Sequence, residues 1–128
     1  MRYFFSLYLF TFLVSCGESF EQMDTEKFNA DIAQNTSIES PEELITIYYN
    51  FPASEGKPNL QITKKEIDNK VFEITLINND VGDDVQGAEK IIMIAKRIVN
   101  KWHVKKISRN WKCHPGRGNT DWGTQSCN

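Results

Sequence analysis

The hydrophobic positions between residues 40 and 51 repeat with the period of a helix. Ser40-Pro41-Glu42-Glu43 has the S-x-x-E form of a capping box, with proline at the first helical position. Pro52 follows and cannot continue a helix. The sequence therefore predicts a helix over residues 41–51. Four residues at spacings of three and four form its expected apolar face: Leu44, Ile47, Tyr48 and Phe51.

Beyond residue 58 the period changes from that of a helix to the two-residue alternation of strands. Short turns at Asp68-Asn69 and Asn100-Lys101 would join neighbouring strands as antiparallel hairpins, and residues 79–86 read as a longer loop. Residues 88–98 are apolar on both faces in their middle, which is typical of a central strand. The expected strands are 59–66, 70–78, 88–98 and 102–113.

One helix followed by a four-stranded antiparallel sheet predicts an α+β fold in which the helix covers one face of the sheet. This order of elements resembles the cystatin-like and NTF2-like architectures, in which a curved sheet wraps a helix. NTF2-like domains carry more helix before the sheet, so the smaller cystatin-like variant fits this length better. The resemblance concerns architecture only, and such folds host many functions.

The first sixteen residues bear on location. One arginine precedes a twelve-residue apolar run, Tyr3 to Val14, which is too short for a permanent membrane span and fits a secretory signal. Leu13-Val14-Ser15-Cys16 resembles the lipobox of bacterial lipoproteins. That resemblance implies diacylglyceryl transfer to the Cys16 thiol, cleavage before Cys16 and membrane anchoring by several acyl chains. Gly17 is not the aspartate that retains lipoproteins at the inner membrane in enteric bacteria, so the outer membrane is favoured.

The chain has 128 residues, which leaves room for one domain. We expect residues 1–15 to be a lipoprotein signal peptide and residues 39–128 to form the domain. Between them, residues 16–38 are polar and acidic and are predicted to be a tether that holds the domain off the membrane. Phe28 and Ile32, four positions apart, permit a short helix there, so part of the tether would dock.

Three cysteines are an odd number, which ordinarily indicates a free thiol. Lipidation would consume Cys16 and leave Cys113 and Cys127 in an oxidising compartment, where a disulfide forms and persists. Closing a loop of this length stabilises a fold by about 3 kcal/mol in the chain-entropy model. Two weaker alternatives stay open. One is a zinc site that includes His103 or His114, and the other is a Cys113–His114 nucleophile.

The segment between the two cysteines contains Pro115-Gly116 and Gly118-Asn119, which are turn formers. We expect a compact closed loop, with Trp122 folded back onto the domain. The pattern W-x-C-x-x-G-R-G-x-x-D-W-x(4)-C over residues 111–127 resembles a C-terminal pattern of small bacterial secreted proteins and lipoproteins. In that pattern a histidine commonly follows Arg-Gly, where this chain has Asn119. The resemblance implies a structural knot rather than a known activity.

Charge is distributed unevenly along the chain. Residues 17–56 hold nine acidic side chains and one basic one, whereas residues 90–120 hold nine Lys or Arg and no Asp or Glu. Solvated edge charges are the simplest explanation, and a surface that steers an acidic partner is the alternative. Nucleic acid is not expected for an exported protein. The candidate partner-binding residues are Lys105, Lys106, Arg109, Arg117 and Trp122.

The sequence contains no serine triad, metal-ligand set or glycine-rich phosphate loop, so we predict neither an enzyme nor a cofactor. Asp80, Asp83 and Asp84 lie close together in the 79–86 loop but lack the calcium-binding EF-hand spacing, which favours a solvated acidic turn.

The leading hypothesis is a monomeric, lipid-anchored binding module of the bacterial cell envelope that acts on a protein or acidic envelope partner. The alternative is an inhibitor or immunity-type protein that blocks a secreted hydrolase such as a lysozyme.

Overall fold

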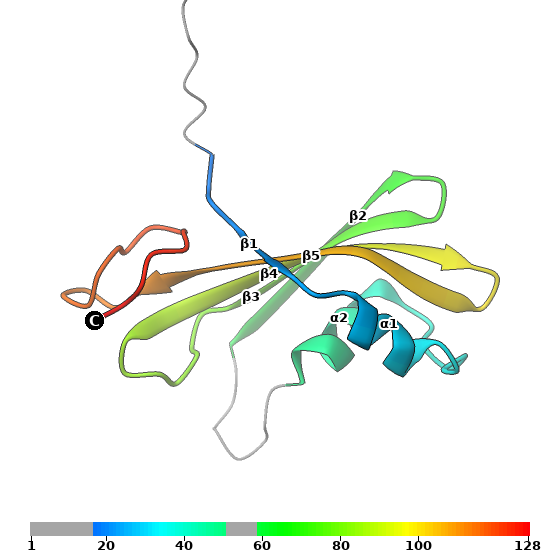
Figure 1. Ribbon diagram of the computed structural model, residues 1–128, viewed down its shortest axis with the longest axis horizontal. Helices are drawn as coiled ribbons and strands as arrows, with labels where there is room; N and C mark the ends of the chain where they lie inside the picture. Colours follow the sequence, from blue (N-terminus) through cyan, green and yellow to red (C-terminus); the bar gives the residue numbers. More distant parts are fainter. Residues whose placement is uncertain (1–16, 51–58) are drawn as a thin grey trace, which may run out of the picture.

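Five antiparallel strands form one sheet, and two short helices lie on one of its faces (Figure 1). The computed structural model describes residues 17–50 and 59–128, so the expected signal peptide, Cys16 and Phe51 lie outside the described residues. The strand order is β1-β5-β4-β3-β2. The elements are β1 Glu21–Met23, α1 Glu26–Ile32, α2 Pro41–Tyr49, β2 Leu60–Asp68, β3 Val71–Asn78, β4 Gln86–Ile98 and β5 Lys101–Cys113.

The predicted α+β class and the four strands of the meander are confirmed. β4 pairs with β3 on one side and with β5 on the other, as its apolar middle indicated. The hairpin turns fall within one residue of the expected positions, at Asn69-Lys70 and Val99-Asn100. Each strand alternates its side chains between the two faces, so the pairing register assigns every residue to a face.

A β-bulge in β5 changes which residues face the helices. Ala95 pairs with Val104 and Ile94 pairs with Lys106, so Lys105 is the extra residue. Because of this insertion, Val104 and Ile107 both reach the core, while Lys105 and Lys106 are both exposed. The bulge explains how two adjacent lysines occur in a strand that is otherwise buried on one face.

The expectation of one helix and a four-stranded sheet needs correction at its N-terminal side. The segment predicted as a tether contributes β1, which pairs with β5 from Glu21↔Arg109 to Met23↔Ile107. It also contributes α1, whose Phe28 and Ile32 are buried in the core. Asn29 holds this segment in place, since its side chain both donates to the Val104 carbonyl and accepts from the Val104 N–H, at 2.8 Å each. Those backbone groups lie beyond the end of β1, where β5 has an open edge.

The predicted start of helix α2 is confirmed, but the predicted buried face of this helix is wrong at one position. The Ser40 side chain accepts a hydrogen bond from the Glu43 N–H at 3.1 Å, as a capping box requires. Leu44 and its neighbour Ile45 are fully buried, whereas Ile47 is 41% exposed. The helix is therefore rotated so that Ile45, rather than Ile47, packs on the sheet, with Tyr48 and Tyr49 half-buried beside it.

The core lies between the helices and the middle of the sheet. Ile74, Leu76, Met93 and Val104 are almost completely buried there. Trp102 closes one end, and its indole N–H donates to the Ile38 carbonyl at 3.0 Å. Neither helix in the described part of the chain has the length and apolar character needed to cross a bilayer.

Candidate functional site

The sheet has one face without a helix on it in the described part of the chain, and the charged side chains of that face are mostly lysines. We call this side, which is turned away from α1 and α2, the basic face. Its acidic strand residues by register are Glu73 and Asp68, which pairs with Val71. Six lysines are assigned to it in the same way: Lys65, Lys90, Lys96, Lys101, Lys106 and Lys112. Lys105, the extra residue of the bulge, lies next to Lys106.

The helix layer on the other side carries the opposite charge. From Asp24 to Glu43 there are six acidic residues and one basic residue, Lys27. The uneven charge along the sequence thus becomes an uneven charge across the thickness of the molecule. Such a separation orients a protein in the field of a charged surface or partner.

The five candidate binding residues do not form one cluster. Lys105 and Lys106 lie on the basic face at the bulge, and Trp122 covers part of the same face. Arg109 lies on the helix side, because it pairs with Ile91 in register and Ile91 is a core residue. Arg117 is exposed in the C-terminal loop, where its guanidinium donates to the Asn128 oxygen at 3.2 Å.

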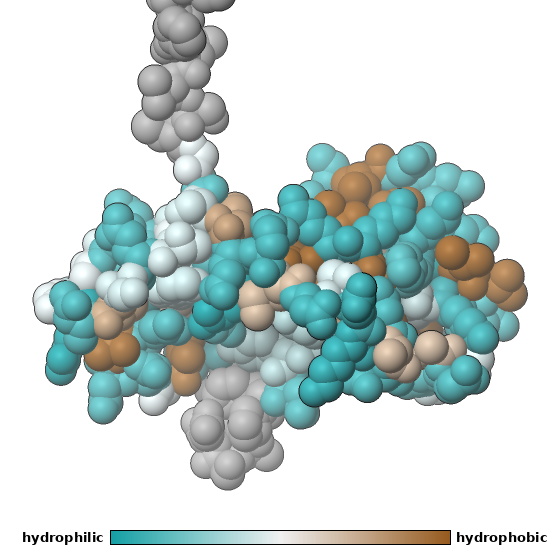
Figure 2. All heavy atoms as spheres, viewed as in Figure 1, coloured by the Kyte–Doolittle hydropathy of each residue, from teal (hydrophilic) through white to brown (hydrophobic). Residues whose placement is uncertain are grey.

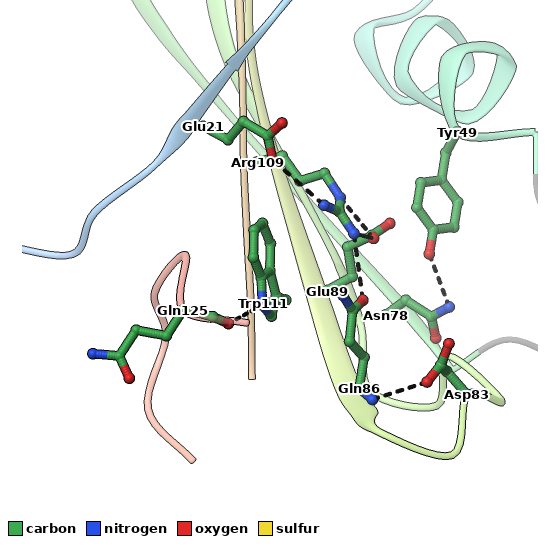
Figure 3. A network of polar contacts seen from close by, with 9 residues as sticks. All are labelled: Glu21, Tyr49, Asn78, Asp83, Gln86, Glu89, Arg109, Trp111 and Gln125. Atoms are coloured by element: carbon green, nitrogen blue, oxygen red, sulfur yellow. Dashed lines mark hydrogen bonds and ion pairs between the residues drawn. The ribbon is translucent and has the colours of Figure 1, made fainter. Parts of the chain in front are cut away.

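Arg109 is the centre of a polar network on the helix side (Figure 3). Its Nε and Nη2 both donate to Glu89 Oε2, at 2.8 and 2.6 Å, and Nη2 also reaches Gln86 Oε1 at 3.3 Å. Glu21 of β1 lies 3.7 Å from Nη1, and the Trp111 ring lies against the guanidinium at 4.6 Å. The side chain is only 23% exposed. Arg109 therefore joins β1, β4 and β5 from within the fold.

The same network continues to helix α2. The hydroxyl of Tyr49 accepts a hydrogen bond from Asn78 Nδ2 at 3.0 Å, and Asn78 is fully buried. Burial raises the pKa of Tyr49 to about 12; Asn78 opposes the rise, while Glu89 adds to it through its charge and a hydrogen bond. A phenol with this pKa stays protonated at neutral pH. The hydrogen bond between Tyr49 and Asn78 therefore joins helix α2 to strand β3.

The C-terminal loop is closed by the predicted disulfide between Cys113 and Cys127. With both sulfurs in this bond, neither is available as a zinc ligand or as a nucleophile. The loop is further held by Trp111, which exchanges backbone hydrogen bonds with Gly123 and donates from its indole to the Gln125 carbonyl at 2.8 Å. The result is a rigid end to β5.

Trp122 folds back onto the domain, as expected, and lies on the basic face. Its ring lies 4.5 Å from Lys90 Nζ and 4.7 Å from Lys112 Nζ, which is cation–π geometry. Lys90 is nearly buried, and its Nζ donates to Glu18 Oε2 at 2.6 Å. The hydrogen bond from Lys90 lowers the pKa of Glu18, against the opposing effect of partial burial, and a second bond from Asn110 assists.

The acidic loop between β3 and β4 has a local explanation. Asp83 accepts backbone N–H bonds from Val85 and Gln86, at 2.7 and 3.1 Å, and these bonds lower the pKa of its carboxyl group. Its backbone carbonyl lies 3.0 Å from His114 Nε2. Asp83 thus organises a turn. Among residues 17–50 and 59–128, no group of three or more His, Cys, Asp or Glu side chains is arranged to hold a metal ion.

Helices α1 and α2 border an open groove of about 540 Å³. Phe28 and Tyr48, whose rings meet edge to face, form part of its wall, and Asp24, Lys27 and Asp31 stand along it. Its mixture of charges and open shape give no indication of a particular ligand.

Sequence reasoning missed Glu18, Lys90 and Asn110, which fix the N-terminal segment to the sheet. Asn110 Nδ2 donates to Glu18 Oε2 and to the Ser19 carbonyl, at 3.1 Å each. The lysine was detectable as a charge inside an apolar strand. Its partner was not, because 72 positions separate Glu18 from Lys90 and no periodicity connects them.

Comparison with known protein families, with curated proteins and with solved structures found no match to this chain.

Proposed function

We propose that the protein is a non-catalytic, lipid-anchored module of the bacterial cell envelope that associates with an acidic surface through the basic face of its sheet. The observation that carries this proposal is the separation of charge, with lysines on the basic face and acidic residues on the helix layer. The lipobox at Leu13-Val14-Ser15-Cys16 supplies the anchor and the location.

The position of the N-terminal segment supports the combination of anchor and surface. Glu18 is bonded to Lys90 and Asn110 of the basic face, so the described chain begins on this side of the sheet. An acyl anchor attached at Cys16 would place the lysines of the same side close to the anchoring membrane and its components. Exposed lysines then act together, because a surface of one sign attracts anions more strongly than separate charges do.

Lys105 and Lys106 provide a test with a matched control. Both are exposed on the basic face, whereas Lys27 of α1 and Lys64, which pairs with Glu42 at 2.8 Å, belong to the helix side. The lipidated full chain, extracted in a neutral detergent, would be bound to immobilised dextran sulfate and eluted with salt. Lys105→Gln/Lys106→Gln should elute at clearly lower salt than Lys27→Gln/Lys64→Gln, although both variants lose two charges.

If the two double variants elute at the same salt concentration, binding depends on the net charge of the protein and not on the basic face. That result would contradict the proposal. Melting temperatures should stay close to wild type in both, since exposed charge substitutions ordinarily change stability by less than about 0.5 kcal/mol.

A second function, inhibition of a secreted hydrolase, is favoured by the C-terminal loop. The Cys113–Cys127 disulfide and the Trp111–Gly123 bridge hold this loop in one shape, and Arg117 is exposed on it. A rigid loop binds with little loss of conformational entropy. If this function holds, the protein should inhibit a lysozyme from an envelope extract, and Arg117→Ala should weaken the inhibition without affecting the dextran sulfate elution. Undiminished lysozyme activity at saturating protein would exclude it.

A further inference from the structure

The first described residues are fixed to the basic face by several contacts. Glu18 bonds to Lys90 at 2.6 Å and to Asn110 at 3.1 Å, and Asn110 also bonds to the Ser19 carbonyl. Thr124 of the C-terminal loop donates to the Ser19 hydroxyl at 3.3 Å. In Figure 1 this segment leaves β1 on the side of the sheet opposite to the helices. The chain therefore leaves the fold at the basic face.

This attachment limits how far an anchor at Cys16 can lie from the sheet. Glu18 follows Cys16 by two residues, and two residues of extended chain span at most about 7 Å. An anchor attached at Cys16 would therefore be joined to Glu18 by no more than this length of chain. A diacylglyceryl group on its sulfur must enter a bilayer from that point, which leaves no long spacer between the membrane and the domain.

The side chains of the basic face have the composition of a membrane-contacting surface. Ile77, Ile92 and Ile94 lie on this face by register and are partly exposed among the lysines. Trp122 lies beside Lys90 and Lys112, and tryptophan and lysine are favoured at the boundary between lipid headgroups and water. Anionic headgroups complement the charge of such a surface.

The end of the sheet at the β2–β3 and β4–β5 turns also carries exposed aliphatic side chains. Ile67, Ile98 and Val99 are 46%, 53% and 81% exposed, at the ends of two neighbouring hairpins. Figure 2 shows hydrophobic residues gathered at this end of the molecule. Val99 has φ +56°, a conformation that a β-branched residue rarely adopts. A strained, solvated valine at a turn is unfavourable in water, and contact with lipid would remove the cost of its exposure.

We infer that the basic face lies against the anionic bilayer that holds the lipid anchor, so that the sheet rests on the membrane and the acidic helix layer faces away from it. This inference rests on the proposed function, because it takes the Cys16 anchor as given. It replaces a domain held off the membrane by a flexible tether with a domain that lies on it. Each lysine near an anionic surface strengthens the contact about fivefold.

Tryptophan quenching by brominated lipids tests this orientation on the full lipidated chain. The protein would be reconstituted into vesicles of brominated phosphatidylcholine and phosphatidylglycerol, with unbrominated vesicles as the reference. One added reporter is His103→Trp, because His103 is exposed on the basic face. It lies about nine strand residues, or roughly 30 Å, from Lys112 and so is well separated from Trp122, the native tryptophan beside that lysine. The matched reporter is Ile47→Trp, since Ile47 is exposed on α2 of the helix layer.

We expect brominated lipid to quench the added fluorescence of His103→Trp strongly and that of Ile47→Trp hardly at all. Neutralising Lys105 and Lys106 should lower the equilibrium constant for contact between the basic face and the bilayer about 25-fold and so reduce the quenching of His103→Trp, and zwitterionic vesicles should reduce this quenching as well.

Equal quenching of the two reporters, or none at His103→Trp in a protein that is fully membrane-bound, would overturn the inference and leave the anchoring intact. A chain that is not retained by the vesicles, with an unmodified Cys16 thiol, would instead refute the proposed lipid anchor. The two failures are therefore distinguishable.

Discussion

At the scale of single residues, the shape of the C-terminal loop depends on two positions that glycine occupies without strain. Gly116 and Gly118 both have positive φ values, +82° and +141°, which glycine adopts without strain. They differ in their surroundings. A Cβ at Gly116 would meet nothing within 4 Å, whereas a Cβ at Gly118 would lie 3.0 Å from the Cys113 sulfur and 3.3 Å from the Ser126 carbonyl.

Gly118→Ala should therefore destabilise the protein more than Gly116→Ala. Backbone strain alone costs about 1–2 kcal/mol at Gly116 and about 1–3 kcal/mol at Gly118, whose φ lies far from the left-handed helical region. The contact with the disulfide adds roughly another 1–3 kcal/mol at residue 118, as overpacking of a closed site ordinarily does. Denaturant unfolding of the two variants measures the difference. Equal losses would show that the loop relaxes freely around the disulfide and is less rigid than its contacts indicate.

At the scale of elements, residues 17–32 show where sequence reasoning succeeded and where it failed. The spacing of Phe28 and Ile32 correctly permitted α1, and the capping box correctly began α2 at Pro41. β1 is three residues long, too short for any alternation, and it forms because its backbone pairs with Ile107–Arg109 of β5. Such a strand is determined by a partner distant in sequence, so composition alone suggested a tether.

The rotation of α2 has a similar origin. The sequence could not distinguish Ile45 from Ile47, since both extend the apolar stripe that begins at Leu44. Tertiary contacts determine which of the two is buried. Tyr49 turns toward Asn78 and Glu89, and this orientation of α2 fixes Ile45 against the sheet. Regular alternation would place Lys105 on the same face as Arg109 and opposite to Lys106. The bulge instead puts Lys105 beside Lys106, on the face opposite to Arg109, and no residue pattern marks that bulge.

The attachment of the N-terminal segment should depend on pH through Glu18. Its folded pKa is lowered by Lys90, so its contribution to stability is full above the ordinary glutamate pKa of about 4.3. That contribution disappears as the pH falls through the lower folded value. The melting temperature of Glu18→Gln should therefore lie below wild type at neutral pH and approach it below about pH 4.

Glu26→Gln is the control, because Glu26 is exposed on α1, away from Lys90. It should stay within about 0.5 kcal/mol of wild type at neutral pH. A difference between wild type and Glu18→Gln that persists undiminished at pH 3 would show that the carboxylate charge does not hold the segment.

At the scale of the whole molecule, three features meet on one side of the sheet. The lysines gather there, the chain leaves the fold there, and the disulfide-closed loop turns Trp122 onto the same side. The lysine-rich segment was visible in the sequence. That it shares one face with the N-terminal segment around Glu18 was not, since this follows from the pairing of β1 with β5 and from the Glu18–Lys90 contact.

The lipid anchor is the claim on which this account depends most, and mass spectrometry of the N-terminal peptide tests it directly. The full chain would be expressed in a bacterium that processes lipoproteins and recovered from its membranes. We expect a mature chain that begins at Cys16 and carries diacylglyceryl on its sulfur, with Cys16→Ala accumulating as an unmodified, uncleaved precursor. A chain cleaved elsewhere, or one that retains residues 1–15 with a free Cys16 thiol, would contradict it.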